Sequence, residues 1–235
     1  MKISVAIPTF NEKDNIARLI KEILDLKIDQ LEIIVIDDNS PDKTGDIVFE
    51  IAQNDSKIHL IRRPRKLGLG TAYIQAFKYA LENGIEIIFE MDADFSHDPK
   101  DIPFFLEKIK KYDLVIGSRY LKGINIVNWP LHRLLLSMFA NKYVKFITEM
   151  KLTDSTSGFK CFRRKVIESF NLDSIKSNGY SFQIEMNYKA YKKGFSIGEI
   201  PIIFIDRNSG KSKLSKNIII EAILIVWKLR LGILK

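Results

Sequence analysis

Residues 85–97 read Ile-Glu-Ile-Ile-Phe-Glu-Met-Asp-Ala-Asp-Phe-Ser-His, an apolar run that ends in a cluster of polar groups. The β-branched and aromatic side chains of residues 85–90 predict a buried strand, because such side chains fit the pleated surface of a sheet. The polar residues that follow would stand just past the carboxyl end of that strand. In open α/β sheets this edge is where ligands bind. The stretch therefore predicts both a central strand and one part of a binding site.

The same alternation of strand-like runs and helix-period stretches extends to both sides. Further strands are expected at 3–7, 32–36, 58–61 and 114–116. Helices are expected at 13–26, 43–53, 71–83 and 100–110. Strands that alternate with helices through short links are typical of a parallel sheet with helices on both faces. The first half of the chain therefore predicts an α/β fold with a Rossmann-like, mostly parallel sheet.

The pattern changes after Gly117. It predicts a long helix at 129–150, a strand at 158–163, a helix at 181–193, a strand at 196–204 and an apolar, basic helix at 218–231. No internal repeat or low-complexity segment interrupts these stretches. We expect one catalytic domain in residues 1–215, followed by a basic amphipathic helical tail in residues 216–235 that contacts a membrane surface or a partner.

Composition narrows the class of protein. The chain has 235 residues, of which 46% are hydrophobic and 28% charged, as in an ordinary globular domain. Cys161 is the single cysteine, which excludes an intramolecular disulfide scaffold. The net charge is +8, and residues 207–235 contain seven basic side chains against one acidic one. Such an end suits an anionic partner: a membrane surface, a phosphorylated substrate or a nucleic acid.

The sequence also suggests where the protein works. The most apolar stretch, residues 218–234, is interrupted by Glu221, Lys228 and Arg230, so it falls short of the ~20 apolar residues of a membrane span. The first strand follows the start of the chain without the apolar region of a signal peptide. We therefore expect a cytoplasmic protein, peripheral at the cytosolic face of a membrane.

Polar residues follow four of the predicted strands. They are Pro-Thr-Phe-Asn-Glu at 8–12, Asp-Asp-Asn-Ser-Pro-Asp at 37–42, Met-Asp-Ala-Asp-Phe-Ser-His at 91–97 and Gly-Ser-Arg-Tyr at 117–120. Since parallel strands end at one edge of a sheet, these groups should converge. The first strand lacks the Gly-x-Gly-x-x-Gly of dinucleotide-binding folds, and Gly68-Leu69-Gly70 is a weak signal by itself.

Asp92 and Asp94 form the sharpest motif. Carboxylates at i and i+2 of an extended segment point the same way, so they would repel each other without a cation. A divalent cation that prefers oxygen ligands would relieve this repulsion, with diphosphate oxygens in its remaining positions. The alternative is a turn in which one aspartate caps the next helix.

Taken in order, these motifs resemble the family 2 glycosyltransferases of the GT-A fold, and within them the dolichol-phosphate (polyprenyl-phosphate) mannose synthases. The resemblance rests on residues 8–12, 36–42, 66–73, 92–97 and 117–120, and on the later segments 179–186, 198–201 and 206–214. It covers nearly the whole chain. It implies an inverting enzyme that transfers mannose from GDP-mannose to dolichyl or another polyprenyl phosphate.

The resemblance also implies a role for each matching residue. The base and ribose of the donor would lie against Pro8, Phe10, Glu12, Ile36 and Asp38. The sugar diphosphate would be bound by Asp92, Ala93, Asp94, Arg119, Arg207 and Lys213. The acceptor phosphate would be bound by Arg119, Arg133 and Ser137. Asp94, with Asp92, would hold Mg²⁺ or Mn²⁺, and Asp94, Arg119 and Arg133 would carry the catalysis.

Two positions depart from the family pattern. Phe10 stands where the family usually has tyrosine, and Ser96 where some members have a glutamine that binds the metal. The charges implied for the site are physically consistent, because two unit charges ~4 Å apart repel by about 4 kcal/mol at an effective dielectric of ~20. A site that brings a lipid phosphate to a diphosphate needs cations. An ionised phosphate needs no general base, so we assign none.

Several alternatives stay open at this point. The donor would be UDP-glucose rather than GDP-mannose in a second interpretation, and a third treats the chain as a basic nucleic-acid-binding domain. The basic end alternates with aliphatic rather than stacking aromatic residues, and the acidic strand ends would repel phosphate without metal, so we expect no nucleic acid as a partner. The C-terminal helix would lie in the membrane interface, dock on a separate membrane-spanning subunit or pack in the core. For His97 and His132 we expect structural roles, and for Asp154 a turn or cap.

Overall fold

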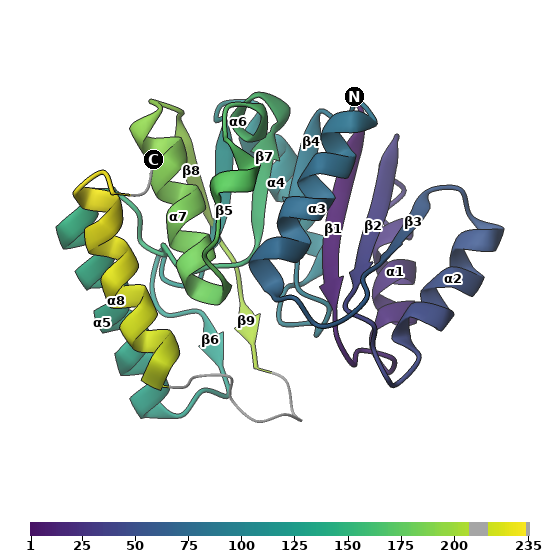
Figure 1. Cartoon of the computed structure of the whole chain (residues 1–235), viewed down its shortest axis with the longest axis horizontal. Helices are drawn as coiled ribbons and strands as arrows, with labels where there is room; N and C mark the ends of the chain where they lie inside the picture. The colour runs from purple at the N-terminus through teal and green to yellow at the C-terminus, as the bar shows by residue number, and fades with distance from the viewer. Residues whose placement is uncertain (207–215, 234–235) are drawn as a thin grey trace.

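The computed structural model describes residues 1–206 and 216–233, and its centre is a sheet that runs through the molecule (Figure 1). The strand order in this sheet is β3-β2-β1-β4-β7-β5-β8. Neighbouring strands are parallel except at β7, which is antiparallel to both β4 and β5. The strands are β1 (Ile3–Thr9), β2 (Leu31–Asp37), β3 (Ile58–Arg62), β4 (Ile87–Glu90), β5 (Leu114–Ser118), β7 (Lys160–Arg163) and β8 (Ile197–Pro201).

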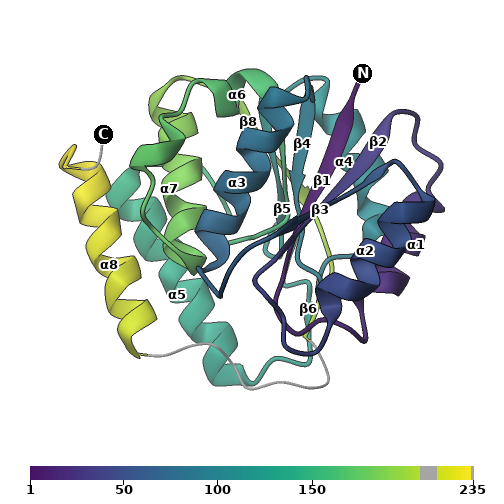
Figure 2. The same cartoon turned by 45° about the vertical axis from the view of Figure 1, so that its right-hand side comes forward.

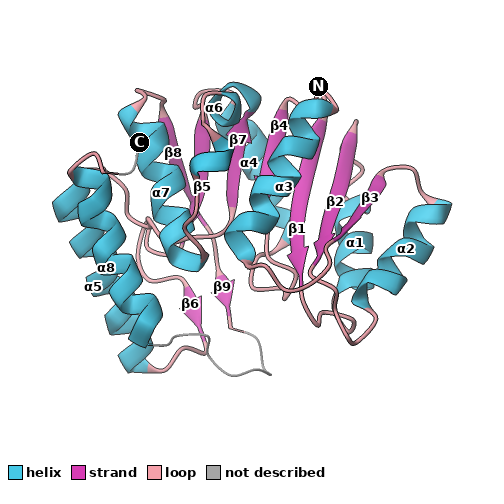
Figure 3. Cartoon of the chain, in the orientation of Figure 1, coloured by secondary structure: helices cyan, strands magenta, loops and turns pink. Residues whose placement is uncertain are grey.

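Helices cover both faces of the sheet, as Figures 1 and 3 show. One face packs against α1 (Ile16–Leu24), α2 (Thr44–Asn54) and α4 (Ile102–Ile109). The other packs against α3 (Leu69–Glu82), α6 (Arg164–Glu168) and α7 (Gly179–Lys192). Side chains of β1 alternate between these two cores, with Val5 and Ile7 in the first and Ala6 in the second, as the two-residue period of a strand requires. The predicted α/β architecture is confirmed.

Several predicted elements differ in extent from the observed ones, and in two of them the backbone geometry shows why. The helix expected at 129–150 is α5 (Leu131–Thr148), which begins after an extended Pro130 and ends at Glu149, where φ is 62°. The strand expected at 196–204 is divided: β8 ends at Pro201, and β9 (Phe204–Ile205) then pairs with β6 (Ile126–Val127) in a small second sheet. The sequence analysis did not predict β6, which is only two residues long.

The C-terminal helix α8 (Lys216–Arg230) packs beside α5 and α7 at one end of the molecule (Figure 2). Ile225, Val226 and Leu229 are buried in the same core as α7. Arg230 pairs with Glu149 at the end of α5, at 2.6 Å. One face of this helix therefore belongs to the core, while its opposite face is exposed. The division of the chain at residue 215 stays a prediction.

Within residues 1–206 and 216–233, every helix is too short or too polar to cross a membrane.

Candidate active site

The carboxyl ends of β1, β2 and β4 meet at one edge of the sheet. Thr9 is the register partner of Asp37, and the backbone amide of Asp38 donates to the Thr9 carbonyl at 3.0 Å. On the other side of β1, the amide of Met91 donates to the Ala6 carbonyl at 3.1 Å. The polar segments that follow these strands are therefore neighbours, as parallel pairing requires.

Residues 93–97 form a bend, so the segment that carries Asp92 and Asp94 does not continue β4, and the extended geometry expected across both aspartates is wrong. Exposure nevertheless alternates along it, with Met91 and Ala93 buried and Asp92 and Asp94 half-buried. Asp94 accepts a hydrogen bond from the Ser96 amide at 3.1 Å, which closes a local turn. Both carboxylates are therefore partly exposed to solvent, while the buried side chains of Met91 and Ala93 anchor the segment in the core.

Two buried side chains hold Asp92 in place. The Tyr73 hydroxyl of α3 donates to Asp92 Oδ1 at 3.4 Å. The Asp92 backbone N–H donates to His97 Nδ1 at 3.1 Å, so the neutral imidazole carries its proton on Nε2. Burial lowers the pKa of His97, which favours that neutral form. The structural role expected for His97 is therefore specific: it accepts a hydrogen bond from the backbone of the acidic bend.

The bend has the chemistry of a divalent-cation site. Burial raises the pKa of Tyr73, and the charges of the carboxylates Asp92, Glu90 and Asp94 raise it further. This pKa shift reflects the negative potential that the carboxylates create at this position. Among the residues that the structure describes, no group of three or more His, Cys, Asp or Glu side chains is arranged to hold a metal by itself. Mg²⁺ is usually held by one or two carboxylates together with substrate phosphates. Asp92 and Asp94 fit that donor set.

The carboxylates expected to read the nucleotide already have protein partners. Asp38 is buried, pairs with the Arg63 guanidinium and accepts from the amides of Leu67 and Gly68 at 3.1 and 3.4 Å. Asp37 accepts from Thr9 Oγ1 at 2.9 Å and from the side chain and amide of Ser40. These bonds fix the loops beyond β2 and β3.

The remaining donor-side residues lie in different environments. The Lys66 ammonium stands over the Phe10 ring, 4.0 Å from its centre, so a cation already occupies one face of this ring. The Glu12 carboxylate accepts a hydrogen bond from the side-chain amide of Asn15 at 2.8 Å, and Pro8 is half-buried. The Ile36 side chain is completely buried in the core, so only its backbone is able to face a ligand.

Arg119 is held rigidly at the end of β5. Its Nε and Nη2 donate to the two carboxylate oxygens of Asp154 at 2.6 and 2.7 Å, and Nη2 also donates to Thr156 Oγ1 at 2.8 Å. The side chains of Arg119 and Asp154 are 4% and 0% exposed. The turn role expected for Asp154 is present in its bond from the Thr156 amide, at 3.3 Å, but its main partner is Arg119.

Arg133 and Ser137 project from α5 on the same side as Arg119. The Arg133 guanidinium lies 4.1 Å from the Trp129 ring centre and donates to Asp206 at 2.5 Å. Ser137 Oγ accepts from the Tyr120 hydroxyl at 2.6 Å. Arg119, Arg133 and Ser137 are therefore brought together as the sequence analysis expects, although each has a protein partner.

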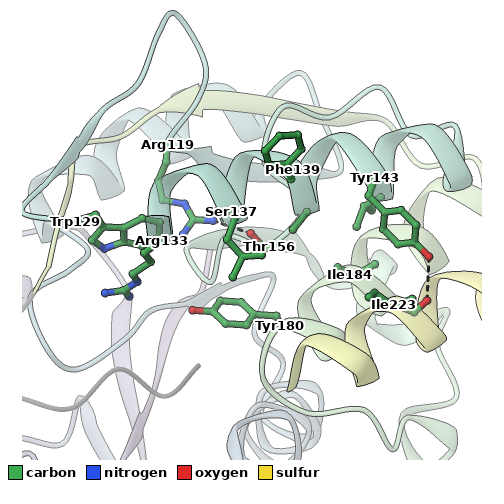
Figure 4. A pocket seen from close by; sticks show the side chains of 13 residues that line it. Arg119, Trp129, Arg133, Ser137, Phe139, Tyr143, Thr156, Tyr180, Ile184 and Ile223 are labelled. Atoms are coloured by element: carbon green, nitrogen blue, oxygen red, sulfur yellow. Dashed lines mark hydrogen bonds between the residues drawn. The ribbon is translucent and has the colours of Figure 1, made fainter. Parts of the chain in front are cut away.

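These three residues line one end of a cavity of about 260 Å³ (Figure 4). Its other end is apolar and lies between α5, α7 and α8. The full lining comprises Arg119, Trp129, Arg133, Leu136, Ser137, Phe139, Ala140, Tyr143, Val144, Thr156, Tyr180, Ile184 and Ile223. The cavity thus presents two guanidinium groups at one end and hydrocarbon along the rest, which suits an amphiphile with an anionic head.

Two of the predicted site residues lie outside the described part of the chain, and some residues near the site were not among the predicted ones. Arg207 and Lys213 lie outside the described residues. The sequence analysis missed Tyr73 and Tyr180, although both belong to motifs that carried the resemblance, and it assigned no ligand role to Trp129. Aromatic residues at these positions read equally well as core packing, so only their position in the fold distinguishes them.

An open α/β sheet with an acidic bend beyond its central strand, next to a cation-lined cavity, fits a glycosyltransferase of the GT-A class. The solved structure of glucosyl-3-phosphoglycerate synthase from Mycobacterium tuberculosis, in complex with Mn²⁺, UDP-glucose and phosphoglyceric acid, has the same fold. It superposes with a TM-score of 0.71 over 98% of this chain and 80% of its own, at 19% sequence identity.

The sequence comparisons go further. Residues 4–170 match the family model described as Glycosyl transferase family 2, and the chain belongs to that family. The undecaprenyl-phosphate mannosyltransferase of Micrococcus luteus is 38% identical over 97% of this chain and 93% of its own. The polyprenol monophosphomannose synthase of Mycolicibacterium smegmatis is 40% identical over 96% of this chain and 86% of its own. The chain is therefore a glycosyltransferase.

Proposed function

We propose that this enzyme transfers a mannosyl group from GDP-mannose to a polyprenyl phosphate, with inversion at the sugar carbon. The observation that carries the proposal is the cavity of Figure 4, which joins two guanidinium groups to an apolar channel. The two relatives at 38% and 40% identity are named for mannosyl transfer to polyprenyl phosphates, and they match this chain over nearly its whole length.

The cavity suits the acceptor in both of its parts. Arg119 and Arg133 would bind the phosphate, since the planar guanidinium makes paired hydrogen bonds with phosphate oxygens. Asp154 and Asp206 leave neither arginine free of partners, so the phosphate would bind donors that point away from these carboxylates. The lipid chain would follow Phe139 and Ile223 towards the exposed surface of α5 and α8.

The donor would bind at the neighbouring strand ends. Its diphosphate would approach Asp92 and Asp94 with Mg²⁺ or Mn²⁺, and the base would lie near Phe10. Arg207 and Lys213 complete the diphosphate site in this proposal, on the basis of the family resemblance. The structural relative that binds Mn²⁺ together with UDP-glucose supports a metal-assisted donor site in this fold.

The reaction is a single displacement. One oxygen of the acceptor phosphate forms a bond to the sugar C1, and the bond from C1 to the diphosphate oxygen breaks with its electron pair leaving on GDP. A phosphate monoester is already ionised near neutral pH, with a second pKa near 6, so no side chain has to remove a proton. A bound dication would neutralise the charge that develops on the leaving diphosphate. Arg119 and Arg133 position the attacking phosphate.

The proposed acceptor requires contact with a membrane, and α5 and α8 present a suitable surface. Leu131, Phe139 and Phe146 are 69%, 66% and 82% exposed along α5, and Trp227 on α8 and Leu231 just after it are also exposed. Lys142, Lys145 and Lys228 are exposed on the same two helices. Apolar and basic side chains on one surface are typical of helices that lie in the lipid headgroup region. We propose peripheral attachment at the cytosolic face, directly or through a separate membrane-spanning subunit.

Attachment is tested by flotation of the purified protein with anionic liposomes. Replacing Phe146 and Leu231 by glutamine should reduce flotation, whereas replacing the exposed ion pair Arg230 and Glu149 by glutamines, which leaves the net charge unchanged, should not. Equal flotation of the first variant and the natural protein would refute direct attachment through this surface.

Transfer itself is tested with radiolabelled donors and a short polyprenyl phosphate. Label from GDP-mannose should enter an organic-extractable lipid in a metal-dependent reaction, and Arg133→Gln should reduce this transfer while Arg164→Gln, on the distant α6, should not. Transfer from UDP-glucose but not from GDP-mannose would replace the proposed donor. No lipid product from either donor would refute the proposal.

A further inference from the structure

His97 occupies a buried position between the acidic bend and the acceptor cavity. Only 2% of its surface is exposed. Its ring stacks on Phe159, with centroids 4.9 Å apart and an interplanar angle of 21°. The Phe204 ring meets it edge-on, with centroids 5.9 Å apart. One stacked and one edge-on aromatic neighbour therefore fix both the place and the tilt of the imidazole.

The fixed ring presents one acceptor to the acidic bend. His97 Nδ1 accepts the backbone N–H of Asp92 at 3.1 Å, five residues earlier in the chain. This bond determines the orientation of the peptide group from which the Asp92 side chain departs. Tyr73 restrains the same residue from the other end, through the carboxylate itself. The direction of the Asp92 carboxylate is thus set before any ligand binds.

The His97 ring also contacts Phe204, an aromatic residue that packs against the lining of the acceptor cavity. Phe204, which lies against His97, meets the Trp129 ring with centroids 5.5 Å apart. The Arg119 guanidinium lies 5.5 Å from the centres of both of these rings. A continuous set of packed groups therefore leads from the backbone of Asp92 through His97 and Phe204 to Arg119.

We propose that His97 is a positioning residue that presets the Asp92 carboxylate for a divalent cation. It does not touch substrate; it acts through the backbone of Asp92. The inference depends on the proposed function only in assuming that Asp92 and Asp94 hold the cation. Groups that orient metal ligands typically contribute 10-fold to 100-fold to metal affinity. Loss of the acceptor at Nδ1 should therefore weaken cation binding by about 10-fold or more.

The test compares three replacements of His97 in the full chain. His97→Asn places an amide oxygen near the position of Nδ1, His97→Gln places its oxygen near the position of Nε2, and His97→Phe keeps a ring but has no acceptor. His59→Phe is the control, since His59 lies on β3 and pairs with Glu32 away from the bend. Binding of Mn²⁺ in the presence of GDP is measured from the electron paramagnetic resonance signal of free Mn²⁺, and thermal unfolding reports the fold.

We expect His97→Phe and His97→Gln to raise the Kd for Mn²⁺ by about 10-fold or more, and His97→Asn to stay within about threefold of the natural protein. GDP binding without metal should be unchanged in all of them. Equal Mn²⁺ affinity in the asparagine and glutamine variants would overturn the proposal, and this pair decides even if the phenylalanine variant does not fold. Because the assay contains no acceptor or sugar, its outcome is independent of which glycosyl transfer the enzyme performs.

Discussion

Replacing Asp154 by asparagine should destabilise the protein strongly. Asp154 and Arg119 form a buried ion pair with two side-chain hydrogen bonds of 2.6 and 2.7 Å and exposures of 0% and 4%. Asparagine keeps one acceptor oxygen but turns an NH₂ group towards a guanidinium that remains charged and buried. Removing one partner of such a pair costs about 3–5 kcal/mol. For a domain of this size that corresponds to a decrease in Tm of about 6–20 °C.

The assay is thermal and urea unfolding of the natural protein and three variants. Asp173→Asn is the matched control, because it removes a carboxylate that pairs with Lys78 at 2.5 Å but is 79% exposed. That variant should unfold like the natural protein, since exposed pairs contribute little. The double variant Arg119→Met with Asp154→Leu should be less destabilised than Asp154→Asn, because it leaves no unpaired buried charge.

The pH dependence gives the same prediction a second readout. Burial alone would raise the pKa of Asp154, but the Arg119 charge and the hydrogen bonds to the carboxylate outweigh burial and lower it from its ordinary 3.8. A carboxylate with a lowered pKa contributes stability that is complete above pH 3.8 and is lost as the pH falls through the folded-state value. The difference in stability between the natural protein and Asp154→Asn should therefore shrink below pH 3.8.

Either of two results would refute this reasoning. Unfolding of Asp154→Asn at the same temperature as Asp173→Asn would mean that the buried pair contributes no more than an exposed one. A difference in the free energy of unfolding between the natural protein and Asp154→Asn that stays constant as the solution is acidified would mean that this difference does not depend on ionisation of Asp154.

At temperatures where the Asp154→Asn variant is folded, its KM for the polyprenyl phosphate should rise more than its KM for GDP-mannose.

Three further predictions concern the bend and the core. Asp94→Ala should raise the metal concentration for half-maximal transfer by at least about 10-fold, because it removes one of the two proposed protein ligands; unchanged metal dependence in a titration would contradict this. Lys160→Met should lose stability in urea as the pH rises above about 7, because burial raises the pKa of Glu90 to about 7 and Lys160 opposes that rise. A buried carboxyl with a raised pKa favours folding only while it is protonated, so a flat pH profile would be the contrary result. Gly70→Ala should cost about 1–3 kcal/mol, since its Cβ would lie 2.4 Å from the Ser177 carbonyl oxygen, and a Tm equal to that of the natural protein would show that the backbone yields.

The strand ends show how far sequence reasoning reaches. Apolar runs followed by polar residues predict that the groups after β1, β2 and β4 share an edge, and parallel pairing brings them together. The antiparallel direction of β7 was beyond such reasoning, because a strand has the same two-residue period in either direction. The two residues of β6 have no period at all, so only their pairing with β9 defines them.

Contacts between distant segments explain the remaining differences. Asp154 and Arg119 are 35 residues apart, and a turn motif such as Asp-Ser-Thr-Ser-Gly does not reveal which cation its carboxylate meets. The C-terminal helix has apolar side chains on more than one face, so its sequence allowed three surroundings. The burial of Ile225, Val226 and Leu229 against the core is a property of the folded chain that periodicity does not determine.

A crystal structure of the enzyme with GDP-mannose, Mn²⁺ and a short polyprenyl phosphate would test the proposed donor, metal and acceptor sites together. We expect a cation between the carboxylates of Asp92 and Asp94 and the donor diphosphate. The lipid phosphate should lie at Arg119 and Arg133, with its chain in the cavity of Figure 4. A donor bound away from the acidic bend, or a lipid phosphate bound away from both arginines, would contradict it.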